Sequence, residues 1–209
     1  MIFHERRHPG LNLGDHHGAA HAGAEASVFG FWVFLMSDLI IFGLMFATYV
    51  TMLGPMAQAG GPGPKDLFEL TSAFIQTMLL LTSSLTFGMA SLAMRHKRSQ
   101  REMSLWLIVT LILGLAFLAF ELRDFAGMFA VSAGPSRSGF LSAFFGLVPL
   151  HGLHVTAGCL WLLIMLIQMR TMGLTDVVKT RLLRLGLFWH FLDIIWIGIF
   201  SIVYLGGLA

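Results

Sequence analysis

Ionisable side chains inside long apolar stretches are the residues of this chain whose types and spacing could support chemistry. Asp38, His151, His154, His190 and Asp193 all lie in such stretches. His151 and His154 are three residues apart, as are His190 and Asp193, so each pair would share one face of a helix. Histidines in this arrangement could ligate a haem or a metal ion, and carboxyl groups beside histidines could relay protons.

The spacing of the histidines argues against a redox centre. A haem pair or a haem–copper centre needs histidines on facing helices at matched depths, whereas His151 and His154 are stacked on one predicted helix. We therefore predict no catalytic, cofactor-binding or metal-ligating residue in this chain. The histidines are better explained as neutral imidazoles that bind Asp, Ser, Thr or backbone groups of neighbouring helices. Two interpretations of Asp38 and Asp193 stay open: they could be steps of a proton relay, or protonated acids that hold helices in register.

Three further residues complete the candidate site. Glu121 lies near the predicted outer end of its apolar stretch, where it could pair with Arg123 or with a lipid head group. Trp189 and Trp196 are seven residues apart, which places them in one packing stripe on a helix. We expect a structural polar layer or a lipid cleft formed by Asp38, Glu121, His151, His154, Trp189, His190, Asp193 and Trp196.

The elements that position these residues must lie in a membrane. Hydrophobic residues make up 56% of the chain and charged residues only 11%, with a mean hydropathy of +0.80. A soluble domain would need about a quarter of its residues charged. The net charge of +2 comes from basic residues between the apolar stretches, where they report topology and do not indicate nucleic-acid binding. Cys159 is the only cysteine, which excludes an internal disulfide.

Five apolar stretches are each longer than the ~20 residues that cross a bilayer. Breaks rich in Gly and Pro, or in charged residues, separate them. The sequence therefore predicts an all-α fold, a polytopic transmembrane bundle of five helices over about 27–53, 68–94, 103–125, 139–170 and 183–207. A polar, histidine-rich tail over 1–26 would precede one membrane domain over 27–209. The tail lacks the apolar core of a cleavable signal peptide, so the first helix is expected to act as an uncleaved anchor.

The distribution of Lys and Arg predicts the orientation in the membrane. The tail and the flanks of the second and fourth breaks carry ten basic residues, whereas the alternating flanks carry only Lys65, Arg123 and Arg137. Basic residues are enriched on the cytoplasmic side of membrane proteins. The N-terminus is therefore predicted to be cytoplasmic, the tail included, and the C-terminus periplasmic.

Four motifs resemble those of a known family, subunit III of the haem–copper respiratory oxidases. FWHFLDIIWIGIFSIVYLGG at 188–207 is similar to the C-terminal helix of the family, and HGLHVTAG at 151–158 resembles another of its helices. LMSDLIIFGLMFATY and FLAFELRDF place Asp38 and Glu121 at acidic positions of the family pattern. The resemblance covers residues 27–209.

Within this family the chain is most like subunit III of the cytochrome bo-type ubiquinol oxidases. Five predicted helices, GGPGPKDLFEL at 60–70 and GPSRSGFLSAFF at 134–145 point to that branch, because cytochrome c oxidase relatives usually carry two more N-terminal helices. Many of those relatives also have a carboxylate near the cytoplasmic end of the helix predicted here over 68–94. Met94, Arg95 and His96 stand there in this chain, so a proton role of that acid is not carried over.

The resemblance implies a non-catalytic accessory subunit of a proton-pumping ubiquinol oxidase, which reduces oxygen in the aerobic respiratory chain of a bacterial inner (cytoplasmic) membrane. Haems, copper and the ubiquinol site would belong to subunit I, which this chain would contact directly, with subunits II and IV in the same complex. The chain itself would bind phospholipid but no redox cofactor. It would support the assembly, stability and proton uptake of subunit I.

Other interpretations of the sequence stay open beside this one. The chain could be subunit III of a cytochrome c oxidase. A stand-alone membrane transporter could use Asp38, Asp193 and the histidines as its pathway, but transporters commonly show inverted repeats or broken helices, and the sequence suggests neither. A membrane b-type cytochrome is disfavoured by the spacing of the histidines.

Overall fold

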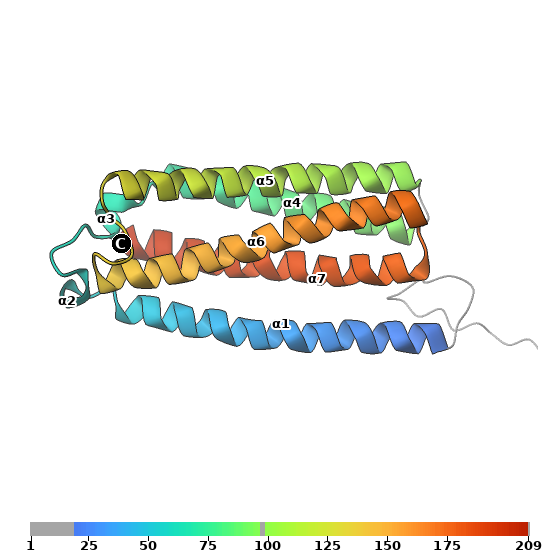
Figure 1. The fold of residues 1–209 in the computed structure, drawn as a ribbon, viewed down its shortest axis with the longest axis horizontal. Coiled ribbons are helices and arrows are strands. Elements are labelled where there is room, and N and C mark those ends of the chain that lie inside the picture. Colours follow the sequence, from blue (N-terminus) through green and yellow to red (C-terminus); the bar gives the residue numbers. More distant parts are fainter. Residues whose placement is uncertain (1–18, 97–98, 209) are drawn as a thin grey trace, which may run out of the picture.

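Long antiparallel helices make up the bundle (Figure 1). The computed structural model describes residues 19–96 and 99–208. Five helical spans in these residues are long and apolar enough to cross a membrane, which confirms the predicted all-α fold with five spans. They are formed by α1 (Ala19–Thr51), α4 (Leu70–Arg95), α5 (Gln100–Ala130), α6 (Gly139–Met172) and α7 (Asp176–Ile199), the last continued by the π-helix η1 (Phe200–Leu205).

Backbone chemistry explains where the spans begin and end. Ser138 caps α6, because its side-chain oxygen accepts a hydrogen bond from the Leu141 N–H. The same helix ends at Gly173, whose φ of +68° lies in the left-handed region that glycine tolerates. The Gly- and Pro-rich break after α1 contains two short helices, α2 (Pro55–Gln58) and α3 (Pro64–Leu67), and a last short helix, α8 (Gly206–Leu208), follows η1. Proline begins both α2 and α3, where its missing N–H costs no helical bond.

Several helices extend beyond the apolar stretches that predicted them. α1 begins at Ala19 against a predicted 27, α5 ends at Ala130 against 125, and α7 begins at Asp176 against 183. A span predicted from hydropathy ends near charged residues, such as Arg123 and Asp124 of α5, whereas the helix itself can continue past them. The N-terminal part of the predicted tail, 1–18, lies outside the described residues.

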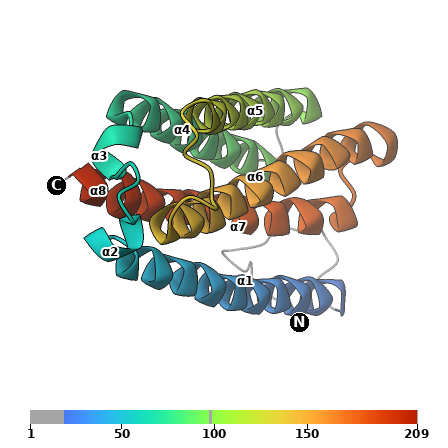
Figure 2. The same ribbon diagram turned by 60° about the vertical axis from the view of Figure 1, so that its left-hand side comes forward.

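α7 has three of the other four spans as neighbours. α7 packs against α1, α4 and α6, while α5 packs against α4 and α6. Figure 2 shows α1 alone along one side of the bundle and α4 with α5 along the other. α7 therefore contributes the largest buried share of any membrane window, 56%, against 11% for α1.

Small residues let the helices approach closely where the large side chains of α7 enter. A Cβ added at Gly114 of α5 would lie 3.0 Å from both Cys159 Sγ and Trp189 Cη2. A Cβ at Gly158 of α6 would lie 3.2 Å from Trp189 Cζ3. The Trp189 indole thus fills the space that these two glycines leave, as is typical of small residues at membrane helix interfaces.

Candidate functional site

Asp38 of α1 faces His154 of α6, with Asp38 Oδ2 3.3 Å from His154 Nε2. The other ring nitrogen, Nδ1, lies 2.7 Å from the carbonyl oxygen of Leu150. Because a carbonyl can only accept, Nδ1 must carry a proton. Asp38 Oδ2 makes no hydrogen bond to the described residues, so its contact with His154 is a close approach of a carboxyl and an imidazole in the interior of the bundle. The pair brings α1 and α6 together at this point.

His151 lies in a cage of aromatic rings at the centre of the bundle. Its side chain is fully buried, and its ring centroid lies 6.5 Å from that of Phe42, 5.9 Å from Phe117 and 5.3 Å from the Trp196 ring. Neither ring nitrogen has a hydrogen-bond partner among the described residues. The expectation that this histidine binds a polar group of a neighbouring helix is therefore wrong within that part of the chain. His151 packs here as one more aromatic side chain between α1, α5, α6 and α7.

Glu121 of α5 rests directly on the backbone of α6. A Cβ added at Gly152 would lie 2.8 Å from Glu121 Cδ, and the glutamate is only 3% exposed. α5 continues for ~14 Å beyond Glu121 at 1.5 Å per residue. The expected pairing with Arg123 is not formed, since Arg123 is exposed and Glu121 Oε1 has no hydrogen-bond partner among the described residues.

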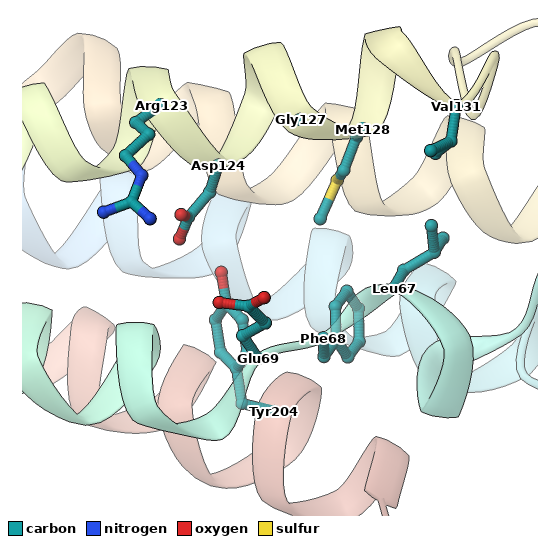
Figure 3. Close-up of a pocket in the computed structure, with 9 residues that line it drawn as sticks. All are labelled: Leu67, Phe68, Glu69, Arg123, Asp124, Gly127, Met128, Val131 and Tyr204. Carbon is teal, nitrogen blue, oxygen red and sulfur yellow. The ribbon is translucent and has the colours of Figure 1, made fainter.

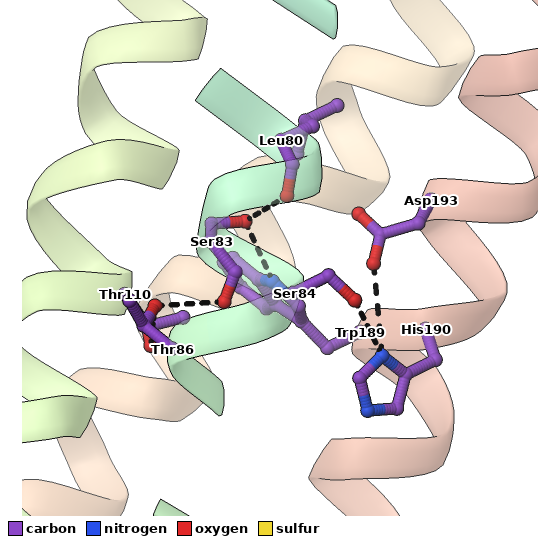
Figure 4. A network of polar contacts seen from close by, with 8 residues as sticks. All are labelled: Leu80, Ser83, Ser84, Thr86, Thr110, Trp189, His190 and Asp193. Carbon is purple, nitrogen blue, oxygen red and sulfur yellow. Dashed lines mark hydrogen bonds and ion pairs between the residues drawn. The ribbon is translucent and has the colours of Figure 1, made fainter. Parts of the chain in front are cut away.

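Both tryptophans of the candidate site join α7 to α4. Trp189 Nε1 donates to Ser83 Oγ at 3.1 Å (Figure 4), and Trp196 Nε1 donates to Thr77 Oγ1 at 3.1 Å. Each indole is about 1% exposed. The two tryptophans are seven residues apart on α7, and their partners Ser83 and Thr77 are six residues apart on α4. The partners follow in reverse order because the two helices run antiparallel. The predicted packing stripe is thus also a pair of interhelical hydrogen bonds.

His190 and Asp193 lie on the side of α7 that faces α4. His190 Nδ1 and Ser84 Oγ are hydrogen-bonded at 2.7 Å, and Asp193 Oδ2 lies 3.7 Å from the same nitrogen (Figure 4). Asp193 is buried, and neither of its oxygens has a hydrogen-bond partner among the described residues. The His190 side chain, by contrast, is 48% exposed. Only the acid of this pair belongs to the interior of the bundle.

Asp124 is a functional candidate that the sequence reasoning did not single out. Its carboxylate accepts hydrogen bonds from Ser72 Oγ at 2.8 Å and from Gln76 Nε2 at 2.6 Å, both from α4. Asp124 also lines a pocket of about 270 Å³ at the end of the bundle near η1, together with Glu69, Arg123 and other residues (Figure 3). The available signal was the recurrence of polar residues at helical spacing along α4, at 72, 76, 83 and 86.

The contacts of the described residues divide the eight predicted residues into separate groups. Asp38 and His154 form one, His190 and Asp193 a second, and Glu121 lies on the backbone of α6 beside the aromatic cage of His151. Among the residues that the structure describes, no three His, Cys, Asp or Glu side chains are placed to hold one metal ion. The contacts of these residues join neighbouring helices.

The fold and these contacts define a multi-pass α-helical membrane protein whose interior polar side chains join its helices. Residues 4–208 match the model of the family described as cytochrome c oxidase subunit III. The chain belongs to this family, which confirms the resemblance found in its motifs. Family membership places the chain among the subunits of the haem–copper oxidases.

Three relatives show how closely the chain follows the family. It is 48% identical to cytochrome bo(3) ubiquinol oxidase subunit 3 of Pseudomonas aeruginosa over 93% of this chain and 92% of the relative. The protein of the same description from Pseudomonas putida is 46% identical over 90% and 89%. Cytochrome c oxidase subunit 3 of Alkalihalophilus pseudofirmus is 43% identical over 86% of both chains.

Proposed function

We propose that this chain is the non-catalytic subunit III of a proton-pumping, oxygen-reducing ubiquinol oxidase of the aerobic respiratory chain. The observation that carries the proposal is the 48% identity to a ubiquinol oxidase subunit 3 over more than nine-tenths of both chains. In this proposal haems, copper and ubiquinol bind to subunit I, and this chain supports its assembly, stability and proton uptake. The complex lies in a bacterial inner membrane and also contains subunits II and IV.

The orientation of the chain is part of the proposal. The end of α4 and the start of α5 lie at the same end of the bundle as the start of α1 (Figure 1), and the sequence that joins them carries part of the basic excess. That end is proposed to be cytoplasmic. A reporter that is active only outside the cytoplasm should be active when fused within 55–64 and silent when fused within 96–101. Activity at 96–101 would contradict the orientation, because the basic flanks would then lie outside.

We further propose that subunit I binds to the face shared by α4 and α7. His190 lies midway along the α7 span, and half of its side chain is exposed on this face. Around it, Ile194 is 64% exposed and Leu85 67% exposed, so the face is otherwise apolar. An ionisable group that faces lipid at this depth is costly, whereas a helix of subunit I could cover the apolar surface and bind the imidazole.

A photo-crosslinking amino acid at Ile194 tests this face in the assembled oxidase. It should capture subunit I, whereas the same amino acid at Leu122, an equally exposed position on α5, should capture it far less. Equal capture at both positions, or capture at Leu122 alone, would contradict the proposed face.

Removing the chain from the purified oxidase tests the accessory role. The remaining complex should keep its haem spectrum and initial quinol oxidase activity, because no redox step is assigned to this chain. It should lose durability, seen as a lower melting temperature or as activity that decays during turnover, since an apolar face of the partner becomes exposed. Loss of the haem signals from a partner that is still folded would contradict the proposal.

Subunit III of a cytochrome c oxidase is the second candidate. The 43% identity to such a subunit from Alkalihalophilus pseudofirmus favours it over any unrelated function. Oxygen consumption by the purified complex separates the two candidates, with reduced ubiquinol or reduced cytochrome c as the only electron donor. Either result leaves the accessory role of this chain unchanged.

Both candidate functions include a phospholipid bound in a cleft of the chain, as the family resemblance implies.

A further inference from the structure

A basic pocket lies between the first turn of α5 and the last turn of α6. It has a volume of about 640 Å³ and is lined by Ser99, Gln100, Arg101, Ser104, Leu105, Ile108 and Arg170. The Gln100 side chain donates a hydrogen bond to the carbonyl oxygen of Met169. This contact fixes the start of α5 against the end of α6 and so holds Arg101 and Arg170 at one opening.

The two arginines of this pocket differ from their basic neighbours on α7. Lys179 is paired with Asp176 at 3.1 Å, and Arg181 Nη1 donates to Gln168 Oε1 at 2.9 Å. Arg101 and Arg170 are exposed, and neither has a carboxylate partner among the described residues. Two guanidinium groups from different helices that line one pocket are suited to bind a phosphate.

An apolar stripe continues from the pocket along α5 toward the middle of the membrane. Leu105, Ile108, Ile112 and Leu115 follow Arg101 at spacings of three and four residues, so they share its helical face, and they are 38–60% exposed. From Arg101 to Leu115 the helix rises ~21 Å, which exceeds the ~15 Å of one leaflet of the hydrocarbon core. A phosphate site with this stripe below it has the shape and polarity of a single phospholipid.

We propose that this pocket is a specific site for an anionic phospholipid, with its phosphate between Arg101 and Arg170 and an acyl chain along the stripe. Basic pockets between transmembrane helices at the cytoplasmic side suit such head groups. The depth of the stripe favours a lipid over a free phosphate, which needs no apolar surface. The site lies at the ends of α5 and α6, apart from the α4–α7 face proposed to bind subunit I.

Lipid titrations of the purified complex, read by native mass spectrometry, test the site. The complex is titrated with phosphatidylglycerol or with phosphatidylcholine of the same acyl chains. The variant Arg101→Gln with Arg170→Gln should weaken the binding of phosphatidylglycerol roughly 25-fold, since each basic side chain at a membrane surface contributes about fivefold. The matched control is Lys179→Gln with Arg181→Gln, which removes two charges at the same end of the bundle and should leave the binding unchanged. Equal binding by the first variant and the intact complex would overturn the proposal.

Two further measurements separate the lipid from other occupants. Ile108→Trp, which fills the stripe but keeps both charges, should weaken the binding of phosphatidylglycerol and leave inorganic phosphate as weak a competitor as before. If inorganic phosphate displaces the lipid fully and Ile108→Trp has no effect, the site binds a free anion and the proposal fails. A photo-crosslinking amino acid at Leu105 should form an adduct with phospholipid in membranes. Capture of a protein subunit there instead would identify a protein interface and overturn the proposal.

Discussion

Replacing Gly152 by alanine tests how tightly α5 and α6 pack around Glu121. The added Cβ would lie 2.8 Å from both Glu121 Cδ and Oε1. Carbon atoms in good contact are about 3.5–4.0 Å apart, so the carboxyl must move by roughly an ångström. Glu121 is only 3% exposed, so little free space surrounds it. Overpacking of a buried site costs about 1–3 kcal/mol, so the substitution should lower the melting temperature of the complex.

The assay is the melting temperature of the purified complex, followed by the loss of its peak in size-exclusion chromatography after heating. Gly146→Ala is the matched control, because this glycine lies on the same helix and its added Cβ would meet only Met45 Sδ at an ordinary 3.8 Å. Combining Gly152→Ala with Glu121→Ala should recover most of the loss, since the second change removes the clashing carboxyl.

Comparing these variants tests whether position 152 and Glu121 are in steric contact. Substitutions at sites that do not interact add within about 0.5 kcal/mol. A deficit that persists unchanged in the Gly152→Ala, Glu121→Ala double variant would refute a steric contact between the two residues. A deficit as large in the Gly146→Ala control would assign the effect to α6 itself and not to Glu121.

The remaining predictions concern hydrogen bonds and acids inside the bundle. A double-mutant cycle of Trp196→Phe and Thr77→Val should give a coupling of about 0.6 kcal/mol, and no more than ~1.7 kcal/mol, in the stability of the complex; additive effects would show that their 3.1 Å contact contributes nothing. Asp38→Asn should preserve assembly because the amide keeps the size of the side chain and a polar group beside His154, whereas Asp38→Leu should lower the yield of intact complex. Asp193→Leu should also lower that yield without changing the haem content per complex, and a variant that assembles normally but loses proton pumping would favour the relay interpretation.

The number and type of membrane spans could be predicted because hydrocarbon imposes one rule on every residue. A span must satisfy its own backbone groups, so an apolar stretch of sufficient length becomes a helix. The ends of the helices could not be read in the same way. α7 begins at Asp176, where Thr175 is its N-cap residue, seven residues before the apolar stretch begins at 183. A cap is a local backbone event that hydropathy does not register.

The partners of the interior polar residues could be predicted only in part. That Asp38, His151 and Asp193 are buried follows from the cost of exposing them to lipid. Which side chain each one meets depends on how neighbouring helices are rotated and shifted, and one sequence carries little information on either. Hence the sequence could not predict that Asp38 contacts His154, or that the His151 nitrogens have no partner among the described residues.

From the packing of α1 we expect Asp38 to fix the position of this helix along the bundle. Leu35, Phe42 and Tyr49 recur every seven residues, are nearly fully buried, and form one narrow seam against the bundle. An apolar seam alone would fix the position of α1 poorly, because lipid tails are as apolar as the seam and compete for the same surface. Asp38 interrupts the seam at the position where His154 lies 3.3 Å away, and a slip of seven residues would move it by ~10.5 Å from that partner. The Tyr49 hydroxyl adds a second polar contact of the seam, because it donates to the carbonyl oxygen of Val203 at 3.5 Å. Polar positions within an apolar seam can select one register, as they do in coiled coils. We therefore expect the contact between Asp38 and His154 to favour one register of α1.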